Sequence, residues 1–126
     1  MARSSLSVNA AIILVVAMVS ITYQHASGVQ NQAEMYKAAA KSYAGADTDL
    51  NQAYIRLSKA LEPEPRAKLK KAELAWLKFR DAEGEFRASE FKGGAMQPMA
   101  RLGYLEDLTR RRSQELKNAY KQFVAD

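Results

Sequence analysis

The stretch Ala75–Gly94 reads AWLKFRDAEGEFRASEFKGG, and its spacing decides the fold class. Trp76, Phe79 and Phe86 recur at intervals of three and seven residues, which is the repeat of one face of an α-helix. Charged residues stand between these aromatic residues, and two glycines close the stretch. The pattern predicts the second half of an amphipathic helix followed by a turn.

The N-terminal segment has the pattern of an export signal. A basic n-region precedes an apolar run from Ala10 to Ile21, and small residues follow as far as Gly28. About a dozen apolar residues suit a secretory signal better than a membrane span, which needs about 20. We expect residues 1–28 to be a signal peptide and residues 29–126 to form one periplasmic or secreted domain. The alternative is an uncleaved N-terminal anchor, and in both cases this segment is the expected contact with a membrane.

The expected mature part is slightly basic and contains neither histidine nor cysteine. Removing Arg3 from the 19 basic residues leaves 18 against 14 acidic ones, a net charge of +4. These charges are dispersed, so nucleic acid is not an expected partner. The composition excludes cysteine-based zinc sites, thiol chemistry and triads that need histidine. Neighbouring carboxylates on a helix point to different faces, so we expect no catalytic residue, metal or cofactor.

Four helical segments separated by breaks predict an all-α fold. The expected helices are residues 31–44, 49–61, 64–91 and 98–124. We expect Gly45 to end the first helix, Asp47 or Asp49 to cap the second, and the prolines at 63 and 65 to separate the second from the third. Short connections then favour a small antiparallel bundle of about four helices.

The two longest expected helices carry apolar seams that polar residues interrupt. The first seam is Leu69, Ala72, Trp76, Phe79, Glu83 and Phe86; the second is Leu102, Leu105, Thr109, Arg112, Leu116, Ala119 and Phe123. Antiparallel pairing about a turn near residue 95 places position 83 opposite position 107. A slide of about one turn between the helices brings Glu83 within reach of Thr109 or Arg112. We therefore expect Glu83 and Arg112 to form an ion pair at the edge of the core, with Thr109 as a hydrogen-bonding neighbour.

These polar residues allow more than one interpretation. A buried ion pair fixes the register of two helices, and removing one partner strands the other charge. Alternatively, Arg80, Asp81, Glu83 and Arg112 line a groove that meets a ligand, or they are ordinary solvated charges. Trp76 is expected to anchor the core rather than to form a ligand platform.

Four spaced motifs follow one another along the expected helices. They are Asp47-x-x-Leu50-Asn51-x-x-Tyr54, Leu69-Lys70-x-Ala72, Ala75-Trp76-x-x-Phe79-Arg80-Asp81-x-Glu83 and Leu105-x-x-Leu108-Thr109-x-x-Arg112-x-x-x-Leu116. Together they resemble the LprI-like lysozyme-inhibitor N-terminal domain family of exported bacterial proteins. The resemblance covers about residues 32–116 and implies a protein-binding domain without catalysis, with lysozyme as the leading partner.

The sequence departs from this family in its cysteines. Family members carry cysteine where this chain has Gly84 and Tyr104, and a further one near Ala38. The resemblance allows a disulfide between the first two positions in the family, across the hairpin. Closing a loop of about 20 residues contributes about 3 kcal/mol, so we expect a more mobile turn around Gly93 and Gly94 here.

The loop after the third expected helix is the candidate partner-binding segment. Lys92, Gly93, Gly94 and the nearby Arg101 combine cations with a flexible backbone, and cations suit the catalytic carboxylates in a lysozyme cleft. The alternative is a non-inhibitory module of the cell envelope that binds peptidoglycan or another envelope protein. A third option is a stress-related envelope protein without a single partner.

Overall fold

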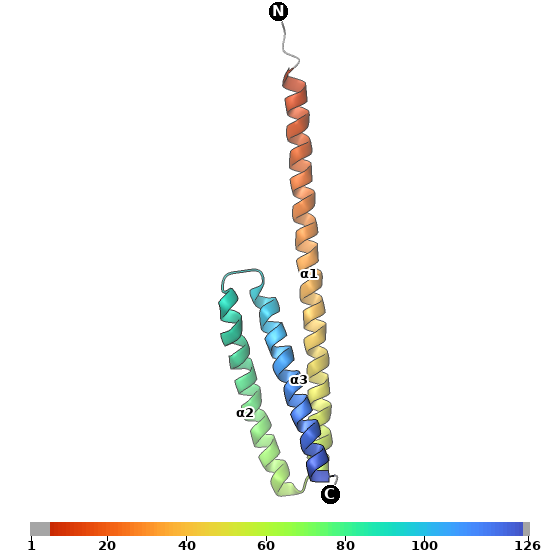
Figure 1. Ribbon diagram of the computed structural model, residues 1–126, viewed down its shortest axis with the longest axis vertical. Coiled ribbons are helices and arrows are strands. Elements are labelled where there is room, and N and C mark those ends of the chain that lie inside the picture. Colours follow the sequence, from red (N-terminus) through yellow and green to blue (C-terminus); the bar gives the residue numbers. More distant parts are fainter. Residues whose placement is uncertain (1–5, 125–126) are drawn as a thin grey trace, which may run out of the picture. The chain divides into compact units, whose positions relative to one another are not determined.

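The computed structural model describes the backbone of residues 6–124 and the side chains of residues 28–124. Its elements are α1 (Leu6–Ala60), α2 (Pro63–Ala88), the short 3₁₀ helix η1 (Ser89–Phe91) and α3 (Gln97–Val124), as Figure 1 shows. No strand occurs in this described part of the chain. The prediction of an all-α fold is therefore confirmed.

The chain divides into two compact units, residues 1–35 and residues 36–126. The first unit holds the N-terminal part of α1. The expected signal segment 1–28 lies on residues that are outside the described backbone or whose side chains are not described, so it stays a prediction. Among the described residues, no helix combines the length and apolar character that a membrane crossing needs.

Residues 6–124 form three α-helices rather than about four, because α1 continues through Gly45. A glycine inside a helix costs about 1 kcal/mol relative to alanine, which is too little to stop a helix held by packing. Ala46 and Leu50, directly after it, are buried at 0% and 2% exposure. Asp47 and Asp49 lie inside the helix, so the predicted break and the predicted cap are both wrong.

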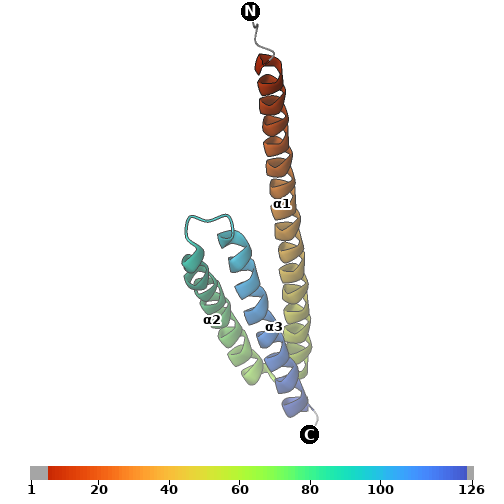
Figure 2. The ribbon, with the colours of Figure 1, turned by 45° about the horizontal axis from the view of Figure 1, so that its top comes forward.

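The second unit is a bundle in which α2 runs antiparallel to both α1 and α3. Ser42 contacts Glu106, and Arg56 stacks on Tyr120; both contacts join residues 64 positions apart, so α1 and α3 are parallel and in constant register. The α2–α3 pair is a hairpin closed by residues 92–96, which Figure 2 shows from a second direction.

The junction between α1 and α2 is held by one arginine. The guanidinium of Arg66 donates hydrogen bonds to the carbonyl oxygens of Ser58 (2.8 Å) and Leu61 (2.7 Å). A cation at this place satisfies carbonyl groups that the end of α1 leaves without a helical partner. Pro63 begins α2, where the missing proline N–H costs nothing.

The hydrophobic core is built mainly from leucines of α1 and α3. Its buried residues are Leu50, Ala53, Leu57, Leu61 and Leu116. Leu69 and Trp76 of α2 pack against them while remaining partly exposed. The predicted seam of α3 is confirmed at positions 102, 105, 109 and 116, whereas Phe123 at its end is exposed.

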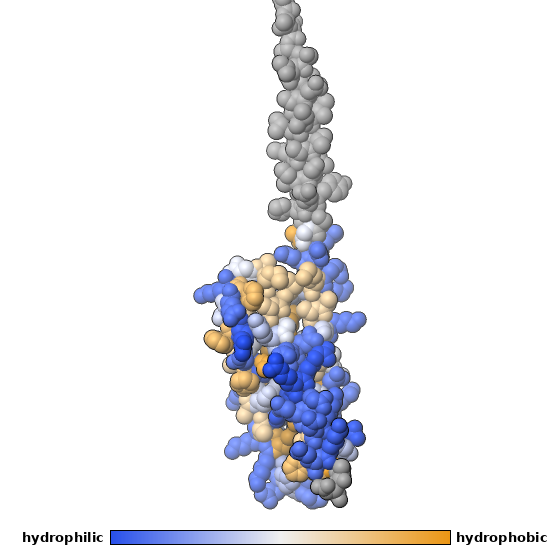
Figure 3. Space-filling model, viewed as in Figure 1, coloured by the Kyte–Doolittle hydropathy of each residue, from blue (hydrophilic) through white to orange (hydrophobic). Residues whose placement is uncertain are grey.

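The predicted seam of α2 is right at Leu69 and Trp76, which pack against the core, and wrong by part of a turn in its second half. Phe79 and Phe86 are 53% and 69% exposed, whereas Glu73, Arg80, Gly84 and Ala88 are the buried residues of this helix. Figure 3 shows hydrophobic side chains reaching the surface over α2. Paired charges occupy the core face because partners on α1 and α3 meet them there.

Candidate functional site

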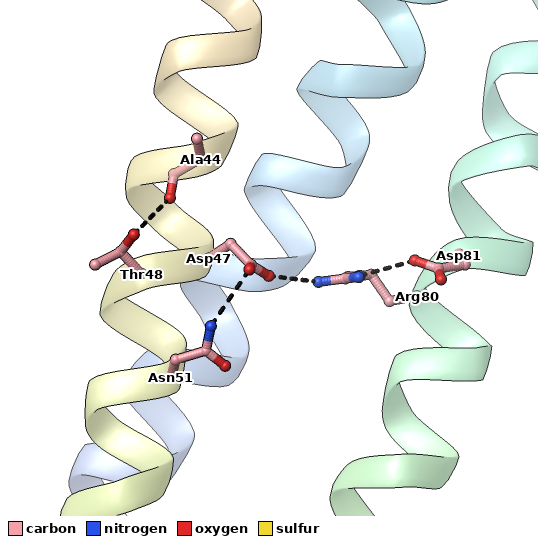
Figure 4. A network of polar contacts seen from close by, with 6 residues as sticks. All are labelled: Ala44, Asp47, Thr48, Asn51, Arg80 and Asp81. Atoms are coloured by element: carbon pink, nitrogen blue, oxygen red, sulfur yellow. Dashed lines mark hydrogen bonds and ion pairs between the residues drawn. The ribbon is translucent and has the colours of Figure 1, made fainter.

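Arg80 links α2 to α1 through a nearly buried guanidinium. Its side chain is 9% exposed, and it donates hydrogen bonds of 3.0 Å to Asp47 of α1 and to Asp81 of its own helix. Asn51, one turn after Asp47, donates to the second oxygen of that carboxylate (3.4 Å), as Figure 4 shows. Asp47 therefore fixes the position of the guanidinium between the helices.

Arg112 links α3 to α2, with a partner other than the predicted one. Its Nε atom lies 3.0 Å from Glu73 of α2, and its Nη1 atom lies 3.0 Å from Glu115 of α3. Glu83 instead accepts a 2.8 Å hydrogen bond from the exposed Arg87, one turn further along α2. The predicted Glu83–Arg112 pair is wrong, because the register of the hairpin sets Arg112 against Glu73, which lies ten residues, or about 15 Å, along α2 from Glu83.

Trp76 lies between the two arginines. The guanidinium carbons of Arg80 and Arg112 are 5.5 Å and 5.8 Å from the centre of its ring, and Arg80 is also 5.6 Å from the ring of Tyr43. Contacts of this kind are worth about 0.5–2 kcal/mol, more where water is excluded. We call Asp47, Glu73, Trp76, Arg80 and Arg112 the polar centre.

The polar centre is arranged to hold charges rather than to react. Burial works against the charge of Arg80, yet its hydrogen bond to Asp81 and the nearby Tyr43 and Asp47 raise its pKa above the ordinary value. Both guanidinium groups face carboxylates at 3.0 Å. Among the described residues, no group of three acidic, histidine or cysteine side chains is placed to hold a metal ion.

Two buried hydroxyl groups of α3 have no hydrogen-bond partner in the described structure. They belong to Thr109 and Ser113, which are 0% and 3% exposed. Thr109 was expected to bond to the Glu83–Arg112 pair, so that part of the prediction is also wrong. Leaving a buried hydroxyl unpaired costs about 1–3 kcal/mol.

The hairpin loop, residues 92–96, is exposed along its whole length. Gly93 has φ +79°, which a residue with a Cβ atom rarely adopts, and its N–H donates to the side chain of Gln97 (3.3 Å). The N–H of Gly94 donates to the carbonyl of Phe91 (3.0 Å). Backbone and side-chain hydrogen bonds therefore shape this turn without a disulfide.

The two predicted binding cations of this region differ in their surroundings. Arg101 is 38% exposed and paired with Glu85 of α2. Lys92 is exposed and makes no ion pair with any described residue. Arg101 thus joins α3 to α2, whereas Lys92 is available to contact a binding partner.

The position of the family's first hairpin cysteine is filled in another way. A Cβ atom on Gly84 would lie 2.7 Å from Cδ2 and 3.1 Å from Cγ of Leu105, which is itself 1% exposed. Leu105 therefore occupies the space next to the glycine and brings α3 close to α2. The family resemblance allows a disulfide at this position of the hairpin, and in this chain the packing of Leu105 against Gly84 takes its place.

The roles of Asp47 and Glu73 were missed in the sequence. Glu73 and Arg80 are seven residues apart and therefore lie on the same face of the helix. This spacing indicates that Glu73 faces the same neighbouring helices as Arg80. Asp47 gave no such signal, because its role depends on a contact between residues 33 positions apart in the chain.

Comparison with known proteins finds one family profile and a related protein that are similar to the chain. The sequence profile described as "Lysozyme inhibitor LprI" matches residues 23–116. An uncharacterized protein of Rhizobium meliloti (strain 1021) is 33% identical over 100 residues, which cover 69% of this chain and 72% of that relative. No solved structure gives a significant match.

Proposed function

Because the chain belongs to the LprI lysozyme-inhibitor family, we propose that it binds lysozyme and inhibits it without catalysing a reaction of its own. The end of the α2–α3 hairpin is the binding element. The single observation that carries this assignment is the exposed, unpaired Lys92 beside a turn shaped by its own hydrogen bonds.

The chemistry of the target supports a cation at this place. Glycosidases of the lysozyme type hold two carboxyl groups across a cleft, and a lysine entering the cleft would meet negative charge there. The turn at Gly93 and Gly94 has no bulky side chain, so it can enter a narrow opening. The polar centre keeps the helices behind the turn in fixed register.

We further propose that residues 1–28 direct export and that residues 29–126 act in the periplasm or outside the cell. The expected net charge of +4 gives no long-range attraction to a basic lysozyme. Binding should therefore rely on short-range contacts and be no weaker at physiological than at low salt, because salt screens the repulsion between two basic proteins.

The test is lysozyme activity on whole cell walls with increasing amounts of folded protein, at low and at physiological salt. We expect inhibition near one-to-one stoichiometry, with Lys92→Ala weakening it about tenfold and Lys70→Ala, an exposed change on the side of α2, leaving it unchanged. Absence of inhibition at tens of micromolar would refute the proposal.

The same preparations separate the alternative function. If the protein sediments with purified peptidoglycan in the absence of lysozyme and does not inhibit the enzyme, a non-inhibitory envelope module is the better assignment. Equal losses of inhibition in Lys92→Ala and Lys70→Ala would keep the inhibitor assignment but remove the hairpin loop from it.

A further inference from the structure

The exposed face of α2 carries an unpartnered apolar seam. Ala72, Ala75, Phe79, Ala82 and Phe86 recur at intervals of three, four, three and four residues, and all five are exposed. This is the spacing with which helices pack along a shared seam in coiled coils. We call these five residues the α2 stripe. The stripe is separate from the hairpin loop and from the polar centre.

The two phenylalanines make the stripe unusual for a free surface. Phe79 and Phe86 are 53% and 69% exposed and lie two turns apart on the same face of α2. Large apolar side chains that are grouped on one face mark an interaction surface more often than isolated ones do. The question is which partner has the matching shape and charge.

The stripe is complementary to itself when two copies run antiparallel. If Phe79 lies opposite Ala82 of a second copy, Phe86 lies opposite Ala75 of that copy. The two-fold axis generates the same two Phe–Ala pairs again with the copies exchanged. Every such layer then pairs one large with one small side chain, which is how facing helices interdigitate at close distance. A parallel arrangement would instead place Phe79 against Phe79 and Ala82 against Ala82.

The charges beside the stripe favour the same arrangement. Lys78 and Glu85 are exposed and lie on one flank of it, seven residues apart. In the antiparallel register, the same flanks of both copies meet, and Lys78 of each copy comes opposite Glu85 of the other. Glu85 also contacts Arg101 of its own chain, but a carboxylate can accept hydrogen bonds from a second partner.

We propose that the α2 stripe binds a second copy of this chain, with the two α2 helices antiparallel. Self-association through α2 leaves the hairpin loop of each copy free. The antiparallel helices direct the two loops to opposite ends of the interface, so a dimer presents two separated binding elements. The inference stands independently of lysozyme inhibition.

The first test is sedimentation equilibrium of the full chain in a density-matched nonionic detergent, which shields the apolar residues 10–21 alike in every variant. We expect a reversible dimer whose dissociation constant rises about tenfold in Phe79→Ala. Ile55→Ala, which truncates an equally exposed residue on α1, is the control and should leave the constant unchanged. Thermal unfolding followed by circular dichroism shows that each variant is folded.

The second test reads the orientation. Lys78→Glu and Glu85→Lys should each weaken the dimer several-fold, because each places like charges opposite each other twice. An equimolar mixture of the two variants should regain the wild-type affinity, since the mixed dimer restores both opposite-charge contacts.

Three outcomes would overturn the proposal. The first is a wild-type chain that stays monomeric up to about 0.5 mM, a concentration at which even a weak dimer forms. The second is a dimer that Phe79→Ala and Ile55→Ala weaken equally. The third is a mixture of charge variants that associates no better than either alone. A monomer that loses lysozyme inhibition in Phe79→Ala would assign the stripe to lysozyme instead.

Discussion

Replacing Gly84 with alanine tests whether Leu105 takes the place of a covalent link in the hairpin. Alanine is favoured over glycine inside a helix by about 1 kcal/mol. The new Cβ atom, however, would lie 2.7 Å from a methyl group of Leu105, and burial leaves this leucine little room to move. Overpacking of this kind costs about 1–3 kcal/mol. We expect a net loss of about 1 kcal/mol in the free energy of unfolding.

Gly45→Ala is the matched control, because it makes the same change inside α1 with no atom within 4 Å of the new Cβ. It should gain about 1 kcal/mol and raise the melting temperature, whereas Gly84→Ala should lower it, each by about 4–8 °C for a domain of this size. Circular dichroism during heating, together with urea unfolding, measures both changes.

The outcome that contradicts this reasoning is a Gly84→Ala variant that gains as much stability as Gly45→Ala. A double-mutant cycle gives a second check. In a Leu105→Ala background the new Cβ has space, so Gly84→Ala should no longer be destabilising. An unchanged cost in that background would place the strain elsewhere.

Four further substitutions test the polar contacts by thermal and urea unfolding. Glu73→Ala should lower the free energy of unfolding by about 2 kcal/mol, since it leaves the nearly buried Arg112 guanidinium with only the exposed Glu115 as a partner. Glu83→Ala should stay within about 0.5 kcal/mol, and equal effects would contradict the observed pairing. Thr109→Val should be neutral or gain up to about 1 kcal/mol by removing an unpaired buried hydroxyl, and a large loss would reveal a hidden partner. The hydrogen bond from the Ser42 hydroxyl, and after it the hydrogen bond from Arg110, lower the pKa of Glu106 below its ordinary value. The stability that this lowered pKa contributes is fully present above the pKa of Glu106 in the unfolded chain, about 4.3, and is lost as the pH falls through the pKa of Glu106 in the folded chain. At pH values below about 4.3 the melting temperature should therefore decrease, and it should decrease less in Ser42→Ala.

The helical class and most helix bounds could be predicted because they follow from local periodicity and from proline. The break at residues 62–65 and the start of α3 near Pro98 were read within one or two residues. The extra break at Gly45 was not real, since the preference of a single glycine is weaker than the packing of Leu50 and Leu57 on the rest of the bundle.

The face that α2 buries could not be read from hydrophobicity. Apolar pattern favoured Phe79 and Phe86, whereas the core side is occupied by Glu73 and Arg80. Charged residues are buried there because Asp47 and Arg112 approach from the other two helices, and such partners become visible only once the helices are placed. Neutralising contacts between distant segments thus outweighed the local pattern.

The parallel register of α1 and α3 has a consequence for how the chain folds. The leucines of α1, such as Leu50 and Leu57, complete their packing with Leu116, which the chain supplies only near its end. The α2–α3 hairpin joins neighbouring segments and can form early, because closing its short loop costs little entropy. During synthesis the N-terminal part of the chain is made first, so the apolar face of α1 stays exposed until α3 has been made. Over that interval the exposed face is a site of aggregation unless a chaperone covers it or the bundle folds quickly.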